Sequence, residues 1–356
     1  MRKSLFFFVC SDKLLIRGDI IMEKVLLGRT GIVVNKNGFG ALPIQRVDMD
    51  RAKVILRKAY DNGIDFFDTA RAYSDSEEKL GEVLSDVRSD IYIATKTMST
   101  TVEGFWKDLD ASLKALKTDY IDIYQFHNPS FCPKPNDGSG LYEAMLEAKE
   151  QGKIKYIGLT NHRLHVAKEA VESGLYDTVQ FPFSYLASPQ EEVLVKLCEE
   201  KNVGFICMKA LAGGLITDSH IAYAFLNSFK NALPIWGIQK ERELDEFLSY
   251  QDNPPVLTHE IKEVIDKERK ELSSEFCRGC GYCMPCPMGI EINNAARMSL
   301  MLRRAPSKNW LSQEWQEKMA KIDSCIHCGA CMKKCPYHLN TPELLKKNYE
   351  DYKTFL

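Results

Sequence analysis

The arrangement of the cysteines restricts this sequence more than any other feature. Eight of the twelve cysteines lie between positions 277 and 335, in two groups that each end in Cys-Pro. A disulfide framework would normally be distributed through a small secreted domain. Tight CxxC groups in a chain without an evident export signal instead predict metal ligation in the cytoplasm. The groups are Cys277, Cys280, Cys283 and Cys286, then Cys325, Cys328, Cys331 and Cys335.

The second group has the spacing Cx2Cx2Cx3CP of bacterial ferredoxins, in which the fourth cysteine of each run binds the other cluster. This spacing predicts two 4Fe-4S clusters. The first group has two residues rather than three before Cys286, which leaves the role of that cysteine open. Structural zinc is the alternative, because CxxC pairs also bind zinc. Four cysteines followed by proline in each group favour iron–sulfur. The predicted sets are Cys277, Cys280, Cys283 and Cys335 for one cluster, and Cys325, Cys328, Cys331 and Cys286 for the other.

Upstream of the cysteines, short apolar runs alternate with amphipathic stretches such as Arg51–Asp61, Val102–Leu116, Leu141–Glu150 and Gln190–Lys201. Strands separated by helices of this length predict βαβ units and a parallel sheet. Eight such repeats match an α/β fold of the (β/α)8 TIM barrel type, although a doubly wound open sheet has the same local pattern. The strand candidates are Gly38–Leu42, Ile64–Asp68, Ile91–Lys96, Ile121–His127, Ile154–Thr160, Thr178–Phe181, Gly204–Lys209 and Leu233–Gly237.

Three regions are therefore predicted. Residues 1–21 are an N-terminal extension of doubtful origin, because Met22 opens a natural domain start and the apolar run from Leu5 to Cys10 is too short for a signal peptide. Residues 22–255 form the barrel, and the prolines at 254 and 255 mark a linker. Residues 256–356 form a small, mostly helical domain of the ferredoxin type. It begins with a charged helix over 261–272 and ends with a helix that starts at Pro342 and is capped by Thr341.

Charge and hydropathy limit the partners. The formal net charge is −2, so no basic surface for nucleic acid is expected. No apolar stretch approaches the roughly 18 residues of a transmembrane helix, so no membrane association is expected.

Several motifs occur in a characteristic order between Met22 and Tyr250: LGRTG, GFG, FFDTARAY, ATK, QFHNP, GLTNH, VQFPFS, MKALAGG and PIWGIQK. In order and spacing they resemble the aldo/keto reductase family. The combination with a C-terminal two-cluster domain also resembles a known branch of that family.

The resemblance implies a catalytic tetrad of Asp68, Tyr73, Lys96 and His127 at C-terminal strand ends, where barrel enzymes place their chemistry. In it, Tyr73 donates a proton to the oxygen of a carbonyl that accepts hydride. Lys96 is expected to lower the pKa of Tyr73, Asp68 to keep the lysine charged, and His127 to orient the substrate oxygen.

The resemblance also implies a nicotinamide cofactor, either NADP(H) or NAD(H). Thr160, Asn161 and Gln180 are implied at its carboxamide, and Gly237 and Lys240 toward its adenosine end. The chain departs from the family at Thr160, where a serine is frequent, and at Trp236, where a proline is usual. Glu243 stands where an arginine often holds the 2′-phosphate. These departures leave the choice between the two nucleotides open.

Two functions are compatible with these residues. The first is an oxidoreductase that acts on a small carbonyl or alcohol substrate in the barrel and exchanges single electrons through its clusters. The second is an electron-transfer subunit that docks a flavoprotein or other redox partner and uses the barrel mainly as a scaffold. Hydride carries two electrons whereas a cluster carries one, and no GxGxxG fingerprint for a flavin or dinucleotide fold is present to join them.

Overall fold

The computed structural model describes residues 23–271, 276–304 and 307–356. The predicted extension at 1–21, including Cys10, lies outside the described residues. So does the break that the sequence predicts near Pro306.

Eight parallel strands close into a barrel in the order β10-β3-β4-β5-β6-β7-β8-β9. Closure excludes the open sheet and confirms the TIM barrel. All eight predicted strands are present, and β3 ends two residues early because Pro43 lies in the 3-10 helix η1 (Leu42–Arg46) that follows. The strands are β3 (Gly38–Gly40), β4 (Phe66–Asp68), β5 (Tyr92–Thr97), β6 (Ile121–His127), β7 (Ile154–Thr160), β8 (Thr178–Pro182), β9 (Gly204–Met208) and β10 (Ala232–Gly237).

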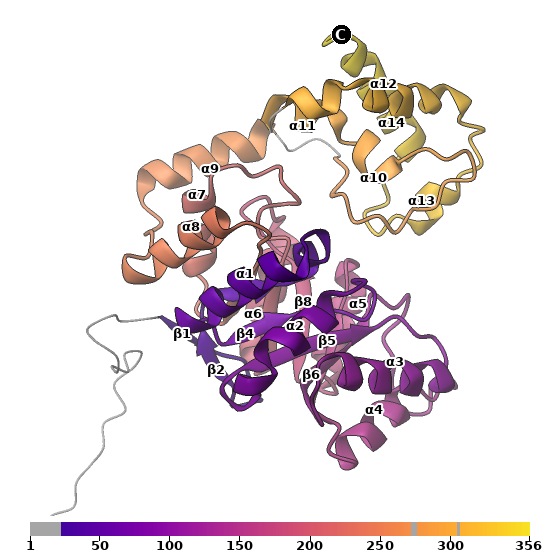
Figure 1. Ribbon diagram of the computed structural model, residues 1–356. Helices are drawn as coiled ribbons and strands as arrows, with labels where there is room; N and C mark the ends of the chain where they lie inside the picture. The colour runs from indigo at the N-terminus through magenta and orange to yellow at the C-terminus, as the bar shows by residue number, and fades with distance from the viewer. Residues whose placement is uncertain (1–22, 272–275, 305–306) are drawn as a thin grey trace, which may run out of the picture.

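Helices surround this barrel, as Figure 1 shows. Each buries an apolar face against the strands. In α1, for example, Ile55, Leu56 and Ala59 are buried at near-helical spacing, and Asp48 caps the first turn by accepting a hydrogen bond from the Arg51 N–H. The helices are α1 (Met49–Asp61), α2 (Ser76–Leu84), η2 (Ser85–Asp90), α3 (Val102–Ala115), α4 (Leu141–Glu150), α5 (Leu164–Ser173), α6 (Pro189–Glu200), α7 (Ser219–Asn227) and α8 (Glu241–Asp252).

A short hairpin, which the sequence did not predict, closes the end of the barrel at which the strands begin. Strands β1 (Lys24–Leu26) and β2 (Val33–Asn35) pair antiparallel. Their apolar side chains Val25 and Val34 pack in one cluster with Phe66, Ile123 and Ile206 from inside the barrel. The opposite end, where the strands finish, is called the barrel mouth below.

Helix α9 (His259–Glu271) matches the predicted charged helix and packs on the barrel. Ile265 belongs to the main barrel core. Arg269 forms an ion pair of 2.7 Å with Glu192 of α6, and Glu268 accepts a hydrogen bond from the Tyr185 hydroxyl.

The remaining helices form a separate group beside the barrel, joined to it by α9 (Figure 1). This region has its own small core, which includes Ile292, Met298, Met319 and Tyr352. The last helix begins at Thr341, but its N-cap is Asn340, because the Thr341 hydroxyl donates to the Leu339 carbonyl oxygen instead of capping. The helices are α10 (Ile292–Ala295), α11 (Met298–Arg304), η3 (Ser307–Leu311), α12 (Gln313–Ala320), η4 (Lys321–Ser324), α13 (Ala330–Lys334) and α14 (Thr341–Lys353).

In the part of the chain that the structure describes, no helix is both long and apolar enough to cross a membrane.

Candidate functional site

Three neighbouring strands carry the four predicted tetrad residues to the barrel mouth. Asp68 ends β4, Lys96 lies one residue before the end of β5, and His127 ends β6. Tyr73 follows β4 in a turn that is fixed by a hydrogen bond from its own N–H to the Ala70 carbonyl oxygen. The parallel register therefore gathers side chains that lie far apart in sequence.

A buried ion pair forms the base of this group. The Lys96 Nζ donates to the two carboxylate oxygens of Asp68 at 2.7 and 2.8 Å and to the Thr69 carbonyl oxygen at 2.6 Å. These three bonds use all three donors of the ammonium group. Both side chains are almost fully buried, so the pair is fixed in one geometry.

Tyr73 and His127 lie on the mouth side of this pair. Their ring centroids are 5.8 Å apart and the rings meet edge to face. The Lys96 Nζ lies 5.2 Å from the centroid of the Tyr73 ring. The Tyr73 ring, the His127 ring and the Lys96 ammonium group are therefore neighbours at the barrel mouth.

Burial controls the protonation of these groups. It lowers the pKa of His127 to about 3, with a smaller contribution from the Lys96 charge, so the imidazole is neutral at neutral pH. Burial also raises the pKa of Tyr73, and Asp68 and Tyr282 raise it further. The resemblance implies that Lys96 lowers this pKa, whereas burial and the Asp68 carboxylate raise it. Tyr73 remains a protonated phenol, which a proton donor requires.

The residues implied at the nicotinamide carboxamide lie beside the tetrad. Gln180 in β8 donates to an Asp68 carboxylate oxygen at 3.4 Å, while its Oε1 is buried without a protein partner among the described residues. Asn161 has both ends of its amide engaged, since Nδ2 donates to the Pro129 carbonyl oxygen and Oδ1 accepts from the Arg163 N–H. The Thr160 hydroxyl contacts the Met208 sulfur at 3.7 Å.

Gly237 ends β10 and Lys240 follows it, on the side of the barrel where β10 pairs with β3. Gly237 is exposed at the end of the strand, and Lys240 precedes the first turn of α8. Glu243 accepts a hydrogen bond from the backbone N–H of Lys240 at 3.1 Å, so this carboxylate caps the helix. Trp236 is buried and stacks on Phe247 with ring centroids 4.3 Å apart, so the departure from the family at this position fills the barrel core.

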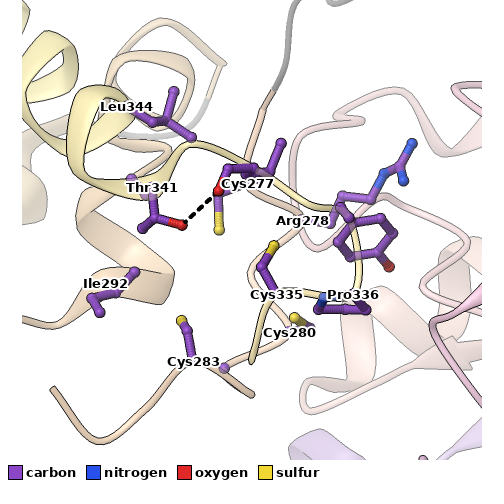
Figure 2. Close-up of a pocket in the computed structure, with 13 residues that line it drawn as sticks. Cys277, Arg278, Cys280, Cys283, Ile292, Cys335, Pro336, Thr341 and Leu344 are labelled. Atoms are coloured by element: carbon purple, nitrogen blue, oxygen red, sulfur yellow. Dashed lines mark hydrogen bonds between the residues drawn. The ribbon is translucent and has the colours of Figure 1, made fainter. Parts of the chain in front are cut away.

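Four predicted cluster cysteines surround one cavity in the C-terminal region. Cys277, Cys280, Cys283 and Cys335 line about 360 Å³ of empty space, part of it open to solvent. Figure 2 shows their sulfur atoms directed into the space between the two loops. The first group and the last cysteine of the second group thus meet in one place, and the soft thiol donors suit an iron–sulfur cluster.

A second cavity, of about 420 Å³, is lined by Cys286, Cys325, Cys328 and Cys331. Cys283 also reaches its wall. Most of the other lining residues are apolar, among them Ile290, Ile292 and Leu345. Among the described residues, no three His, Cys, Asp or Glu side chains converge closely enough to be grouped around a single metal ion. The remaining described cysteines, Cys132, Cys198 and Cys207, are buried in the barrel core.

His162, which the sequence did not single out, joins the barrel mouth to the first cavity. It follows Asn161 directly, and its Nδ1 forms a hydrogen bond of 2.6 Å with the Tyr337 hydroxyl. Its ring also meets Tyr282 edge to face at 5.0 Å between centroids. Tyr337 lies two residues after Cys335, and Tyr282 lies between Cys280 and Cys283. Both cysteine loops of the first cavity therefore contact the barrel mouth.

Comparison with known proteins agrees with this geometry. Residues 36–249 match the aldo/keto reductase family, and residues 276–340 match the 4Fe-4S dicluster domain. The chain belongs to the aldo/keto reductase family. Its helical C-terminal region carries a 4Fe-4S domain of the ferredoxin type, and the protein is an oxidoreductase. Aldo/keto reductases act on small carbonyl substrates.

The curated relatives match this chain over its barrel region. L-galactose dehydrogenase of Arabidopsis thaliana is 33% identical over 216 residues, which cover 55% of this chain and 68% of the plant protein. NADH-specific methylglyoxal reductase of Escherichia coli is 27% identical over 253 residues, which cover 63% of this chain and 77% of the bacterial protein. Among solved structures, the holo form of an aldo-keto reductase from Bacillus halodurans superimposes with a TM-score of 0.61 at 24% identity, covering 69% of this chain and 96% of that chain. At this identity the structure supports the fold alone.

Proposed function

We propose that the barrel carries out NAD(P)-dependent carbonyl–alcohol chemistry through Asp68, Tyr73, Lys96 and His127, and that the C-terminal domain transfers single electrons through two 4Fe-4S clusters. The observation that carries the first half is the convergence of the Tyr73 phenol, the neutral His127 imidazole and the Lys96–Asp68 ion pair at the barrel mouth. The ion pair keeps its position beside the Tyr73 phenol because its charged groups are satisfied by protein atoms alone.

Each side chain has one role in this proposal. Hydride addition to a carbonyl leaves negative charge on its oxygen, and the Tyr73 O–H supplies the proton that neutralises it. His127, kept neutral by burial, orients that oxygen by hydrogen bonding. The positive charge of Lys96 stabilises the negative charge that develops on the carbonyl oxygen. Asp68 holds the ammonium group in position by accepting two hydrogen bonds.

The nucleotide site is proposed from unsatisfied atoms. The buried Gln180 Oε1 is a free acceptor that suits the N–H of a carboxamide, and a buried acceptor without a partner is unfavourable. Thr160 and Asn161 lie one strand away, and Gly237 and Lys240 lie toward the adenosine end. The nicotinamide supplies the hydride when bound. One relative is named as NADH-specific, so NADH and NADPH both belong in the assay.

The cluster ligands are proposed as Cys277, Cys280, Cys283 and Cys335 for the first cluster, and Cys286, Cys325, Cys328 and Cys331 for the second. Each set lines one cavity. We propose residues 22–255 as the catalytic domain and 256–356 as the cluster domain, with a cytoplasmic location that preserves thiolate ligands.

An assay of the barrel tests this function directly. Oxidation of NADH or NADPH is followed anaerobically with a panel of small aldehydes and ketones. Tyr73→Phe should lower turnover by a factor on the order of 100, the effect of a lost general acid, and leave nucleotide affinity unchanged. The matched control is Tyr60→Phe, which removes a surface hydroxyl that contacts Asp90. Equal turnover by Tyr73→Phe and the wild type would exclude the tetrad.

One surface supports the alternative of an electron-transfer subunit that docks a redox partner. Ile326 and Met332, beside the exposed Cys328 of the second cavity, present apolar side chains that are 61% and 41% exposed. This surface suits a weak redox partner. Loaded clusters with neither nucleotide binding nor turnover in the assay above would favour this function.

A further inference from the structure

Two cations from different parts of the chain lie close to the cysteine loop of the first cavity, and a third, Arg278, lines the cavity itself. Arg297 precedes α11 and donates through Nη1 to the Gly213 carbonyl oxygen of the barrel at 2.7 Å. A Cβ added at Gly279, between Cys277 and Cys280, would lie only 2.7 Å from the Cζ of Arg297. Gly279 also has a φ of +62°, so both its backbone and its lack of a side chain permit this close approach. The guanidinium group thus packs directly on the cysteine loop.

The Arg297 Nε–H has no acceptor among the described residues although the atom is buried. No carboxylate of the described chain lies within ion-pair distance of this side chain. Burial lowers the pKa of Arg297, and the sulfur atoms of Cys277 and Cys280 counteract that effect. An unpaired buried donor on a charged group is costly, so an anionic acceptor at this cavity would satisfy it.

Lys209 contributes the second charge from the barrel side. It follows β9 with a φ of +56° and lines a small pocket together with Phe276 and Arg278, the two residues on either side of Cys277. Burial lowers its pKa, whereas Cys280 and Cys277 raise it. Arg278, the third cation nearby, is already engaged by Glu191 at 3.5 Å. Arg278 lines the cavity but is paired, so Arg297 and Lys209 are the nearby cations without a carboxylate partner among the described residues.

The second cavity has a different lining. Apart from its cysteines, His327 is the only ionisable residue among the described side chains that line it. Its other walls are apolar side chains and glycine. The two cavities therefore resemble each other in their thiol ligands and differ in the charges around them.

We propose that Arg297 and Lys209 raise the reduction potential of the first cluster above that of the second, so that an electron entering the chain settles beside the barrel mouth. Reduction adds one negative charge to a four-cysteine cluster, and nearby cations and N–H donors to sulfur stabilise the reduced form. Burial alone lowers the reduction potential of a cluster. The two cations are therefore needed if the first cluster is to have the higher potential. The proposal rests on the ligand sets given above.

The test is an anaerobic redox titration of the holoprotein followed by electron paramagnetic resonance. Cys328→Ala, which removes a ligand of the second cluster, assigns the two signals. In the wild type the first cluster should be reduced at the higher potential. In Arg297→Gln its ratio of reduced to oxidised form at a fixed potential should fall at least tenfold, a shift of about 59 mV for one electron. Lys209→Met should shift it in the same direction, and the second cluster should not change.

Arg303→Gln is the matched control, because this arginine lies in the same domain but pairs with Asp351 away from both cavities. It should leave both potentials unchanged. If Arg297→Gln loses iron, Lys209→Met still provides the test. The proposal is overturned if the first cluster has the lower potential in the wild type, or if variants with full iron content keep its potential. Failure of the wild type to bind two clusters would instead contradict the proposed function.

Discussion

The Lys96–Asp68 ion pair of the barrel and the first cysteine cavity satisfy their polar groups in opposite ways. In the barrel, Lys96, Asp68 and the Thr69 carbonyl saturate one another without any ligand. In the C-terminal domain, thiols line empty space, and Arg297 retains a buried donor without a partner. We infer from this difference that the barrel can fold by itself, whereas the folding of the C-terminal domain is coupled to its clusters.

The largest effect is expected where a cluster ligand is lost. Cys280→Ala should reduce the iron content by about half, from about eight to about four per chain. It should also destabilise the C-terminal domain without unfolding the barrel, because most buried apolar residues of the two regions fall in separate clusters, with Met301 of α11 the exception in the barrel cluster. Iron analysis and thermal unfolding measure these effects. Cys198→Ala, at a buried thiol of the barrel, is the control and should keep all iron. If the barrel and the C-terminal domain of Cys280→Ala unfolded together, the inference that the barrel folds by itself would be wrong.

A smaller but still large effect is expected at the ion pair. Lys96→Met leaves the Asp68 carboxylate buried without its partner, so the free energy of unfolding of the barrel should fall by about 3–5 kcal/mol. Urea denaturation of the barrel transition measures it. The double variant Asp68→Asn with Lys96→Met should recover much of the loss, because no charge then remains buried. A loss below about 1 kcal/mol in Lys96→Met would show that solvent reaches the pair.

The smallest effect concerns pH. The pKa of His127 is lowered to about 3 in the folded protein from an ordinary value of 6.5. The unfolded chain therefore binds an additional proton between these values, and stability falls as the pH is lowered from about 6.5 toward 3. Between pH 7 and pH 5 this residue should account for about 1–2 kcal/mol of lost stability. Urea denaturation of His127→Gln at both pH values should show a correspondingly smaller loss. The same loss as in the wild type would mean that His127 is protonated in the native state.

The features that could be predicted from the sequence are those that depend on a local pattern of residues. Strands such as Ile121–His127 were located to the residue because a buried parallel strand is a continuous apolar run. The cysteine spacing predicts two sets of four cysteines, and each set lines one cavity. The hairpin of β1 and β2 was missed, because strands of three residues leave too short a pattern. The contact between His162 and Tyr337 could not be predicted, since it depends on how two domains meet and no periodicity encodes that. The CGYC and CPY sequences did place a tyrosine beside each cysteine loop, which was the available indication.

The proposed function combines in one chain a hydride-transfer barrel and two iron–sulfur clusters, of which the first lies beside the barrel mouth. Anaerobic purification followed by iron, acid-labile sulfide and zinc analysis tests it most directly. We expect about eight irons and eight sulfides per chain, with broad absorption that dithionite bleaches. One or two zinc ions per chain with no iron and no sulfide would contradict the claim.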